Sequence, residues 1–424
     1  MGKYKPYPEY KDSGVEWLGD VPEGWSVTRN IGLFSERNEK NFPHEELLAV
    51  TIAHGVLPQK KLAQLTDRKN TASEDKTNYK LVKVDDIAYN KMRMWQGAIG
   101  VSSHQGIVSP AYVILQPKQN VHSRFFYYQF KTPAFIKEAG RFSYGLCDDM
   151  NSLRYDDFRT IYSVVPFLKE QIQITAFLDH ETAKIDRLIE KQEKLIELLK
   201  EKRQAVISHA VALPTDSHAP IKFYVEILPG YAFPSAEYSA KKDGVKLLRG
   251  VNVGVENLKW DELETWPEED LTAYLDYELK VGDLVIGMDR PWIKEGIRVA
   301  FVQQSDLPAL LLQRVARMRA VDALRQSYLY LLLKSEEFKA HVFADLTGVS
   351  VPHLSADQIG SFVFKLPTLE EQDKRLENVQ RQFNMIDSCV AKAKSSIKLL
   401  KERRTALISA AVTGKIDVRD WQKD

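Results

Sequence analysis

The chain has 424 residues, enough for two to four domains, and its 44% hydrophobic and 28% charged content is ordinary for a globular protein. Its net charge of +1 excludes binding to nucleic acid by bulk positive charge, so such binding would need clustered patches or a basic partner. Two cysteines exclude a disulfide framework and a cysteine-based zinc site, and they fit a cytoplasmic protein. We expect no signal peptide and no membrane span, because no apolar run is long enough.

Composition and periodicity divide the chain into seven segments. They are an N-terminal arm (1–24), a first mixed domain (25–166), a long helix (167–212), a linker (213–220), a second mixed domain (221–367), a second long helix (368–412) and a tail (413–424). In the arm, aromatic and apolar residues alternate with Gly and Pro, which is typical of a segment that packs on other parts of a protein. We therefore expect an α+β protein with two mixed α/β domains.

Short apolar runs mark the strands of the first mixed domain. The runs at 47–50 and 111–115 are bounded by Gly, Pro and Asn, which predicts strands. The pattern at 124–139 predicts a helix, and Pro133 marks either an interruption or a new first turn.

The first long helix is predicted from a stretch without Gly or Pro, from Glu170 to Val211, rich in Leu, Lys, Glu and Gln. Its proposed seam alternates spacings of four and three: Ile174, Leu178, Glu181, Ile185, Leu188, Gln192, Leu195, Leu199, Lys202 and Val206. That spacing predicts a coiled coil. At 1.5 Å per residue the helix would be roughly 60 Å long, and so narrow an apolar stripe needs a partner helix.

The second long helix repeats the first. Gln171 corresponds to Gln372, an offset of 372 − 171 = 201 that holds without a gap to Val211 and Val412. Both copies begin with the pattern P-x-L-x-E-Q. The mixed domains repeat more weakly, with Arg93-Met-Trp95 matching Arg290-Pro-Trp292, for example. The chain is therefore predicted to be a tandem duplication in which the helices form a shared frame and the mixed domains recognise two different things.

Five features, in this order, resemble the specificity subunit of Type I restriction–modification systems. They are the arm YKDSGVEWLGDVPEGW, the stretch from Asn90 to Tyr112 (NKMRMWQGAIGVS…GIVSPAY), GDLVIGMDRPW with LLLQRVARMR between Gly282 and Arg319, both P-x-L-x-E-Q patterns, and the tail AVTGKIDVR. The resemblance covers essentially the whole chain. The short linker lacks a second copy of the arm, so the internal symmetry is imperfect there.

The resemblance implies two target-recognition domains separated by two long antiparallel helices in a pseudo-twofold, circular arrangement. It implies that each domain reads one half of an asymmetric double-stranded DNA site and that the helices set the spacer. The implied partners are two methyltransferase subunits and restriction subunits. No cofactor is expected in this chain, because S-adenosylmethionine, ATP and Mg would belong to those partners.

Catalytic motifs are weak. Glu74-Asp-Lys76, Glu278-Leu-Lys280 and Glu337-Phe-Lys339 match part of a nuclease motif, as chance allows in so charged a chain. Neither a glycine-rich S-adenosylmethionine loop nor an N/D-P-P-Y/F tetrad occurs, and the histidines form no zinc motif. We expect no catalytic and no metal residues. The alternatives are a stand-alone DNA-modifying enzyme with a cryptic nuclease or methyltransferase centre, and a coiled-coil scaffold for proteins only.

Base reading requires side chains that match base edges, chiefly Arg or Lys for guanine and Asn or Gln for adenine. The candidates are Asn90, Lys91, Arg93, Gln96, Ser109 and Tyr112 in the first domain, and Arg290, Lys294, Arg298, Gln313 and Arg314 in the second. An alternative interpretation makes Trp95 and Trp292 core residues whose neighbouring arginines are structural. It is favoured for the tryptophans and stays open for the arginines. The basic clusters 200–203 and 401–404 would contact spacer phosphates or neutralise a helix C-terminus.

Overall fold

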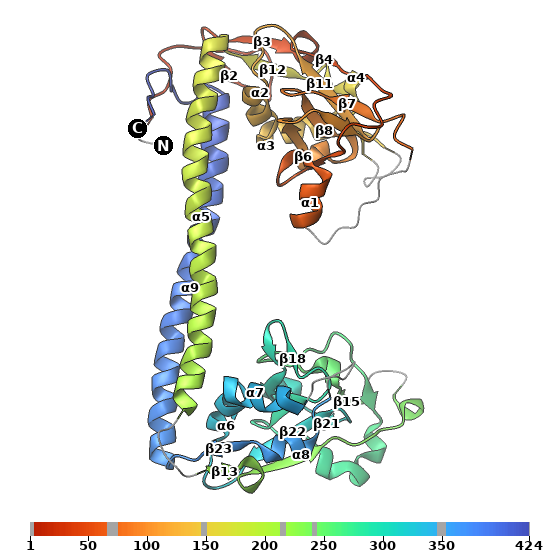
Figure 1. Ribbon diagram of the computed structural model, residues 1–424, viewed down its shortest axis with the longest axis vertical. Helices are drawn as coiled ribbons and strands as arrows, with labels where there is room; N and C mark the ends of the chain where they lie inside the picture. The colour runs from red at the N-terminus through yellow and green to blue at the C-terminus, as the bar shows by residue number, and fades with distance from the viewer. Residues whose placement is uncertain are drawn as a thin grey trace. The chain divides into compact units, whose positions relative to one another are not determined.

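The computed structural model describes residues 4–65, 75–145, 151–212, 218–239, 244–345 and 353–423. The chain forms two compact units, the first made of Met1–Gln192 and Ser395–Asp424, the second of Glu193–Lys394. Each unit contains one mixed α/β domain and a segment of each long helix (Figure 1).

A four-stranded antiparallel sheet lies at the centre of the first mixed domain, in the order β4 (Phe34–Glu36), β11 (Tyr112–Pro117), β8 (Ile87–Asn90) and β9 (Ile99–Val101). Strand pairs surround it: β1 (Tyr10–Asp12) with β2 (Asp20–Pro22), β3 (Ser26–Arg29) with β12 (Tyr162–Val165), β5 (Leu48–Thr51) with β6 (Gly55–Pro58), and β7 (Lys80–Val82) with β10 (Gly106–Val108). The helices are α1 (Gln59–Leu65), α2 (Ser123–Phe130), α3 (Pro133–Arg141), α4 (Tyr155–Phe158) and the 3₁₀ turns η1 (Asn30–Gly32) and η2 (Lys91–Gln96). Pro133 is the first residue of α3 and Thr132 caps it, so the proline restarts the helix.

The core of the first unit is rich in aromatic side chains. Phe34 and Phe126 meet edge to face with ring centroids 5.4 Å apart, a geometry that stabilises aromatic pairs beyond the area they bury. The arm contributes Val21, and the neighbouring Trp25 at the start of the mixed domain is likewise fully buried. The tail returns to the arm, where the Asp417 amide donates to the Lys5 carbonyl at 2.7 Å. The two ends of the chain therefore belong to the same core.

The second mixed domain repeats this topology. Its four-stranded sheet has the order β14 (Val225–Pro229), β22 (Val315–Ala320), β17 (Leu284–Gly287) and β20 (Val299–Phe301). Further strands are β16 (Thr265–Trp266), β15 (Val245–Leu248) and β21 (Ala309–Leu311) in one sheet, β13 (His218–Pro220) with β23 (Val363–Lys365), and β18 (Trp292–Ile293) with β19 (Gly296–Ile297). The helices are α6 (Gln326–Leu333), α7 (Glu336–Asp345), α8 (Ala356–Ser361), and the 3₁₀ turns η4 (Ile221–Phe223), η5 (Ser235–Glu237), η6 (Gly250–Asn252), η7 (Glu268–Tyr277) and η8 (Gln304–Asp306).

The matching sheet orders show that the two mixed domains are structural repeats. The interpretation of residues 213–220 as a linker is partly wrong. The end of this segment forms β13, which pairs with β23 just as β3 pairs with β12 in the first domain. The rest of that segment, residues 213–217, lies outside the described residues.

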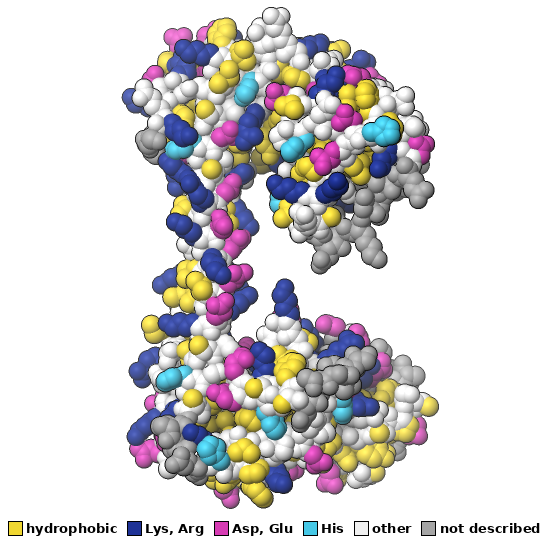
Figure 2. Space-filling model, viewed as in Figure 1, with side chains coloured by type: hydrophobic (Ala, Val, Ile, Leu, Met, Phe, Trp, Pro, Cys, Tyr) yellow, Lys and Arg dark blue, Asp and Glu magenta, His cyan; other side chains and the backbone are white. Residues whose placement is uncertain are grey.

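The long helices α5 (Leu168–Val211) and α9 (Leu369–Val412) each contain 44 residues and run antiparallel. In the first unit Arg404 binds Asp186 at 2.9 Å, and in the second unit Arg203 binds Asp387 at 2.6 Å, so numbers rise along one helix as they fall along the other. The antiparallel expectation is confirmed. Acidic and basic side chains alternate over much of the helix surface in Figure 2. No helix among the described residues has both the length and the apolar character that a membrane span requires.

The contact seam predicted for the first long helix is wrong in its middle part. Leu188 and Leu195 are 47% and 41% exposed, while Ile189 and Ile196 are partly buried beside them. A straight helix has 3.6 residues per turn, so a stripe assigned with a 3.5-residue period drifts off the contact line after a few turns. The drift leaves large apolar side chains in solvent on the helices.

A buried glutamine joins each long helix to its mixed domain. Gln372 accepts from the Arg325 amide at 2.8 Å and donates to the carbonyls of Ala323 and Pro367, both at 2.9 Å. Gln171 makes the corresponding bonds to His122, Asn120 and Pro166. This explains the glutamine of P-x-L-x-E-Q: an amide can satisfy one donor and two acceptors at once.

We predict that Gln372→Met lowers the free energy of unfolding by about 2–4 kcal/mol, because a side chain of similar size leaves the Arg325 amide and the carbonyls of Ala323 and Pro367 without the partner that they have in the buried Gln372 side chain. Urea denaturation measures the change. The control is Gln380→Met, at an exposed position where the amide binds only Asn384. Equal stability of the two variants would contradict the role of Gln372.

Candidate nucleic-acid interface

In the first unit, the predicted residues meet where β8 ends beside β11. Asn90 and Tyr112 are directly paired across the two strands, and the Lys91 amide donates to the Ala111 carbonyl at 3.0 Å. The Asn90 side chain accepts from the Met92 amide at 2.9 Å and so begins η2. Ser109 lies in the turn before β11, where its carbonyl accepts from the Tyr112 amide.

The turn η2 presents most of its side chains to solvent. Arg93 and Gln96 are exposed, while Met94 is fully buried and anchors the turn. The expectation that Trp95 is a core residue is wrong: it is 37% exposed and donates through Nε1 to the Met92 carbonyl at 3.0 Å. Met94 takes the core position because adjacent residues of a short helical turn cannot both face inward.

Burial shifts two titratable groups at this surface. It lowers the pKa of Lys91, with the nearby Lys80 ammonium acting in the same direction. It also raises the pKa of the Tyr112 hydroxyl, against the effect of a hydrogen bond from Asn90. A tyrosine that keeps its proton at neutral pH offers both a donor and an acceptor to a base edge.

In the second unit, two arginines occupy backbone conformations that favour glycine. Arg290 has φ 45° and Arg314 has φ 71°. Arg314 is exposed, and its Nη1 lies 3.1 Å from His353 Nδ1 and 3.8 Å from Asp289 Oδ1. The His353 ring in turn contacts Asp289 at 2.7 Å. Backbone strain of this kind is concentrated at binding sites, where it holds a side chain in a fixed place.

The remaining predicted residues of the second unit differ in accessibility. Lys294 is exposed between β18 and β19, and Gln313 is exposed beside Arg314. Arg298 is partly buried, and its guanidinium donates to the carbonyls of Val253 and Asp289 at 2.9 and 2.8 Å. Burial lowers the pKa of Arg298. For this arginine the geometry favours the structural interpretation, and Trp292 likewise packs against the core ring of Phe338.

Sequence reasoning missed Asp289 and His353. His353 is 64 residues from Asp289 in the chain, and only the fold brings the two together. One of the two roles considered for the basic clusters 200–203 and 401–404, neutralising a helix C-terminus, is wrong. The helices continue to Val211 and Val412, well past Arg203 and Arg404, so these arginines do not neutralise a helix end.

A metal centre would require several His, Cys, Asp or Glu side chains close together. Ranges 4–65, 75–145, 151–212, 218–239, 244–345 and 353–423 contain no group of three or more His, Cys, Asp or Glu side chains placed to hold a metal ion. The Glu278 and Glu337 motifs lie in this described part, whereas Glu74 lies outside it.

No protein-family model matches the chain. It is 27% identical over 427 aligned positions to the Type I restriction enzyme MjaVIII specificity subunit of Methanocaldococcus jannaschii, covering 94% of this chain and 95% of that protein. The chain is a homologue of Type I restriction enzyme specificity subunits. The specificity subunit of EcoAI from Escherichia coli is 31% identical over 191 residues, which is 45% of this chain and 31% of EcoAI's subunit.

Solved structures share the fold of this chain. The HsdS subunit from Thermoanaerobacter tengcongensis superposes with a TM-score of 0.56 at 14% identity, covering 93% of this chain and 98% of that one. A chain of a type I R-M system, solved to explain complex assembly and conformational transition, gives a TM-score of 0.71 at 13% identity, with 93% and 99% covered. At such low identity these matches bear on the fold.

We predict stability effects of different size for two arginines of the second unit. Arg298→Met is expected to lower the free energy of unfolding by roughly 2 kcal/mol, because the carbonyls of Val253 and Asp289 lose their donor. Arg314→Met is expected to change it by less than about 0.5 kcal/mol, because the side chain is exposed. Thermal or urea unfolding of the purified variants measures both changes. If Arg298→Met is as stable as the unchanged protein, the structural role of Arg298 is wrong and this arginine remains a candidate for DNA contact.

Proposed function

We propose that this specificity subunit is the non-catalytic DNA-recognition component of a Type I restriction–modification complex. One observation carries the proposal: the same sheet occurs twice, and at the same place in each copy the exposed side chains differ. The first copy exposes Arg93 and Gln96, with Asn90 partly buried beside them, and the second exposes Arg290 and Arg314. Identical frames with different surface chemistry suit a DNA site made of two unlike halves.

The side chains at each surface match base edges. Asn and Gln pair through two bonds with adenine in the major groove, and Arg pairs through two bonds with guanine. The contact of Arg314 with His353 and Asp289 limits the directions that its guanidinium can take. A pre-positioned arginine loses less conformational entropy on binding, which favours discrimination between bases.

Partners complete the function. A net charge of +1 gives the isolated subunit little general attraction to phosphates, so methyltransferase subunits supply much of the DNA affinity. Two methyltransferase subunits and the restriction subunits would also bring S-adenosylmethionine, ATP and Mg. Exposed leucines on α5, Leu195 and Leu198, provide apolar area for such a protein partner. A stand-alone DNA-modifying enzyme is not favoured, since the relatives are specificity subunits.

The proposal predicts that reading residues act on one half-site at a time. In the complex with its methyltransferase, Arg314→Ala is expected to relax one base position in the half read by the second domain, weakening discrimination there roughly 10- to 100-fold. Asn90→Ala is expected to affect only the other half. Mapping methylated sites in a host that expresses each variant measures both effects.

The matched control is Arg381→Ala, which removes an exposed arginine from α9. It is expected to leave every base position as selective as in the unchanged protein. Relaxation of both half-sites by Arg314→Ala alone would contradict the assignment of one domain to one half.

The helices are proposed to set the spacer between the half-sites. Inserting seven helical residues after Gln192 in α5 and after Lys394 in α9 lengthens both helices by about 10 Å, or about 3 base pairs of DNA. The spacer is expected to grow by that amount while both half-sites stay the same. Selection of bound sites from a random-spacer library measures it, and an unchanged spacer would refute the ruler role.

A further inference from the structure

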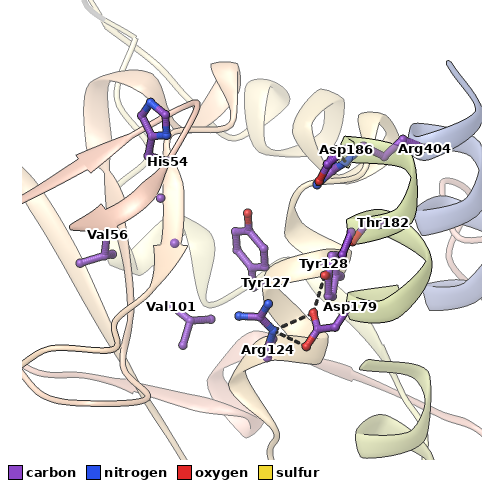
Figure 3. Close-up of a pocket in the computed structure, with 13 residues that line it drawn as sticks. His54, Val56, Val101, Arg124, Tyr127, Tyr128, Asp179, Thr182, Asp186 and Arg404 are labelled. Atoms are coloured by element: carbon purple, nitrogen blue, oxygen red, sulfur yellow. Dashed lines mark hydrogen bonds and ion pairs between the residues drawn. The ribbon is translucent and has the colours of Figure 1, made fainter. Parts of the chain in front are cut away.

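A pocket of about 300 Å³ lies in the first unit between the mixed domain and the long helices (Figure 3). The hairpin of β5 and β6 contributes His54 and Val56, α2 contributes Arg124 and Tyr127, and α9 contributes Arg404. We propose that this pocket binds a phosphate group of the DNA backbone next to the half-site read by the first domain. The inference rests on the proposed function and adds one specific contact to it.

Two arginines reach the pocket with free hydrogen-bond donors. Arg124 uses its Nε to bind both carboxylate oxygens of Asp179 at 2.8 Å, and Arg404 binds Asp186 through Nε and Nη2. Among the described residues, neither Nη of Arg124 nor the Nη1 of Arg404 has an acceptor. Figure 3 shows the free end of Arg124 and the Tyr127 hydroxyl projecting into the pocket. A phosphate oxygen accepts from such donors.

A third cation lies beside the pocket without lining it. The Lys131 ammonium donates to the carbonyls of Ile52 at 2.9 Å and Gly97 at 3.0 Å, and no carboxylate in the described part of the chain pairs with it. Burial lowers the pKa of Lys131, and the positive charge of Arg404 adds to that effect. An anion near Lys131 and Arg404 relieves their repulsion. Because Gly97 ends η2, the same lysine links the pocket to the reading surface of the first domain.

The corresponding place in the second repeat carries different side chains. Lys334 ends α6 as Lys131 ends α2, but Lys334 is paired with the carboxylate of Glu256. Phe383 stands at the position of Thr182, offset by 201, and Arg203 stacks on its ring at 3.8 Å. At this place the second repeat thus holds a phenylalanine ring and a paired lysine, whereas the first repeat has a pocket in which Arg124 and Arg404 keep donors beyond those that bind Asp179 and Asp186. The duplication therefore supplies its own comparison.

Close packing also shapes the pocket wall. A Cβ added to Gly100 would lie 2.5 Å from the Val56 amide nitrogen, so only glycine lets the hairpin lie against β9. The equivalent residue of β20 is Ala300.

The decisive variant is Thr182→Phe, which copies the second repeat and fills the pocket without changing any charge. In the complex with its methyltransferase, the dependence of log K on log salt for the cognate duplex is expected to become shallower by about 1, the loss of one phosphate contact. Lys131→Met is expected to give a similar change. Lys118→Met, which removes an exposed lysine that likewise donates to a carbonyl, is expected to give none.

Glu256→Gln tests whether the salt dependence follows the pocket or only the net charge of the protein. It removes one negative charge from the second unit but leaves Phe383 in place, so the salt dependence is expected to stay unchanged. Salt dependence equal to the unchanged protein's in both Thr182→Phe and Lys131→Met would overturn the inference. Thermal unfolding of Thr182→Phe confirms that the variant is folded, and Lys131→Met keeps the test valid if it is not.

Free phosphate is the other source of the same chemistry. If inorganic phosphate raises the thermal midpoint of the unchanged protein but not of Thr182→Phe, while DNA binding is identical in both, the pocket binds free anions and the DNA assignment is wrong. A complex that fails to select any DNA site would instead overturn the proposed function itself.

Discussion

The reciprocal packing of two repeated helices is the constraint on which the rest of the structure depends. Each long helix has an apolar stripe too narrow for isolation, and each finds its partner in its own copy. The ion pairs Asp186–Arg404 and Asp387–Arg203 are one interaction made twice, because the offset of 201 relates their members. Antiparallel pairing of two similar sequences makes this reciprocity possible, so drift in one helix must be matched in the other.

Each mixed domain is tied to this helical frame through its buried glutamine. The side chains of Gln171 and Gln372 accept hydrogen bonds from backbone amides of the residues that precede α2 and α6. The start of a long helix and the start of a domain helix therefore share one hydrogen-bond network. The network uses backbone groups of the domain. Domain side chains can therefore change without disturbing it, which lets two reading surfaces diverge on one frame.

Charge follows the same division between frame and surface. Many arginines of the frame are committed to carboxylates or carbonyls, which fits the near-neutral balance of the chain. The cations left for DNA are few and local: the exposed side chains of η2, Arg290 and Arg314, and the pocket around Arg124. Such a distribution gives selectivity more than affinity, and the proposed methyltransferase partners supply the remainder.

The sequence alone determined the duplication and the two long helices, because a gapless offset and a stretch without Gly or Pro are local patterns. The antiparallel pairing was an expectation drawn from the resemblance to specificity subunits, and the ion pairs between the helices confirm it. It also placed Asn90 and Tyr112 in one stretch, and the fold pairs them across neighbouring strands. It misjudged Trp95 and the middle of the seam, since burial depends on which way a turn or a drifting helix faces its neighbour.

Only the tertiary structure decided which cations are free. Arg298, Arg314 and Arg404 look alike in the sequence, yet the first is held by carbonyls, the second faces solvent and the third borders a pocket. The contact of His353 with Asp289, and the difference between Lys131 and Lys334, depend on residues far apart in the chain. Chain folding sets such distances, and no pattern within one segment records them.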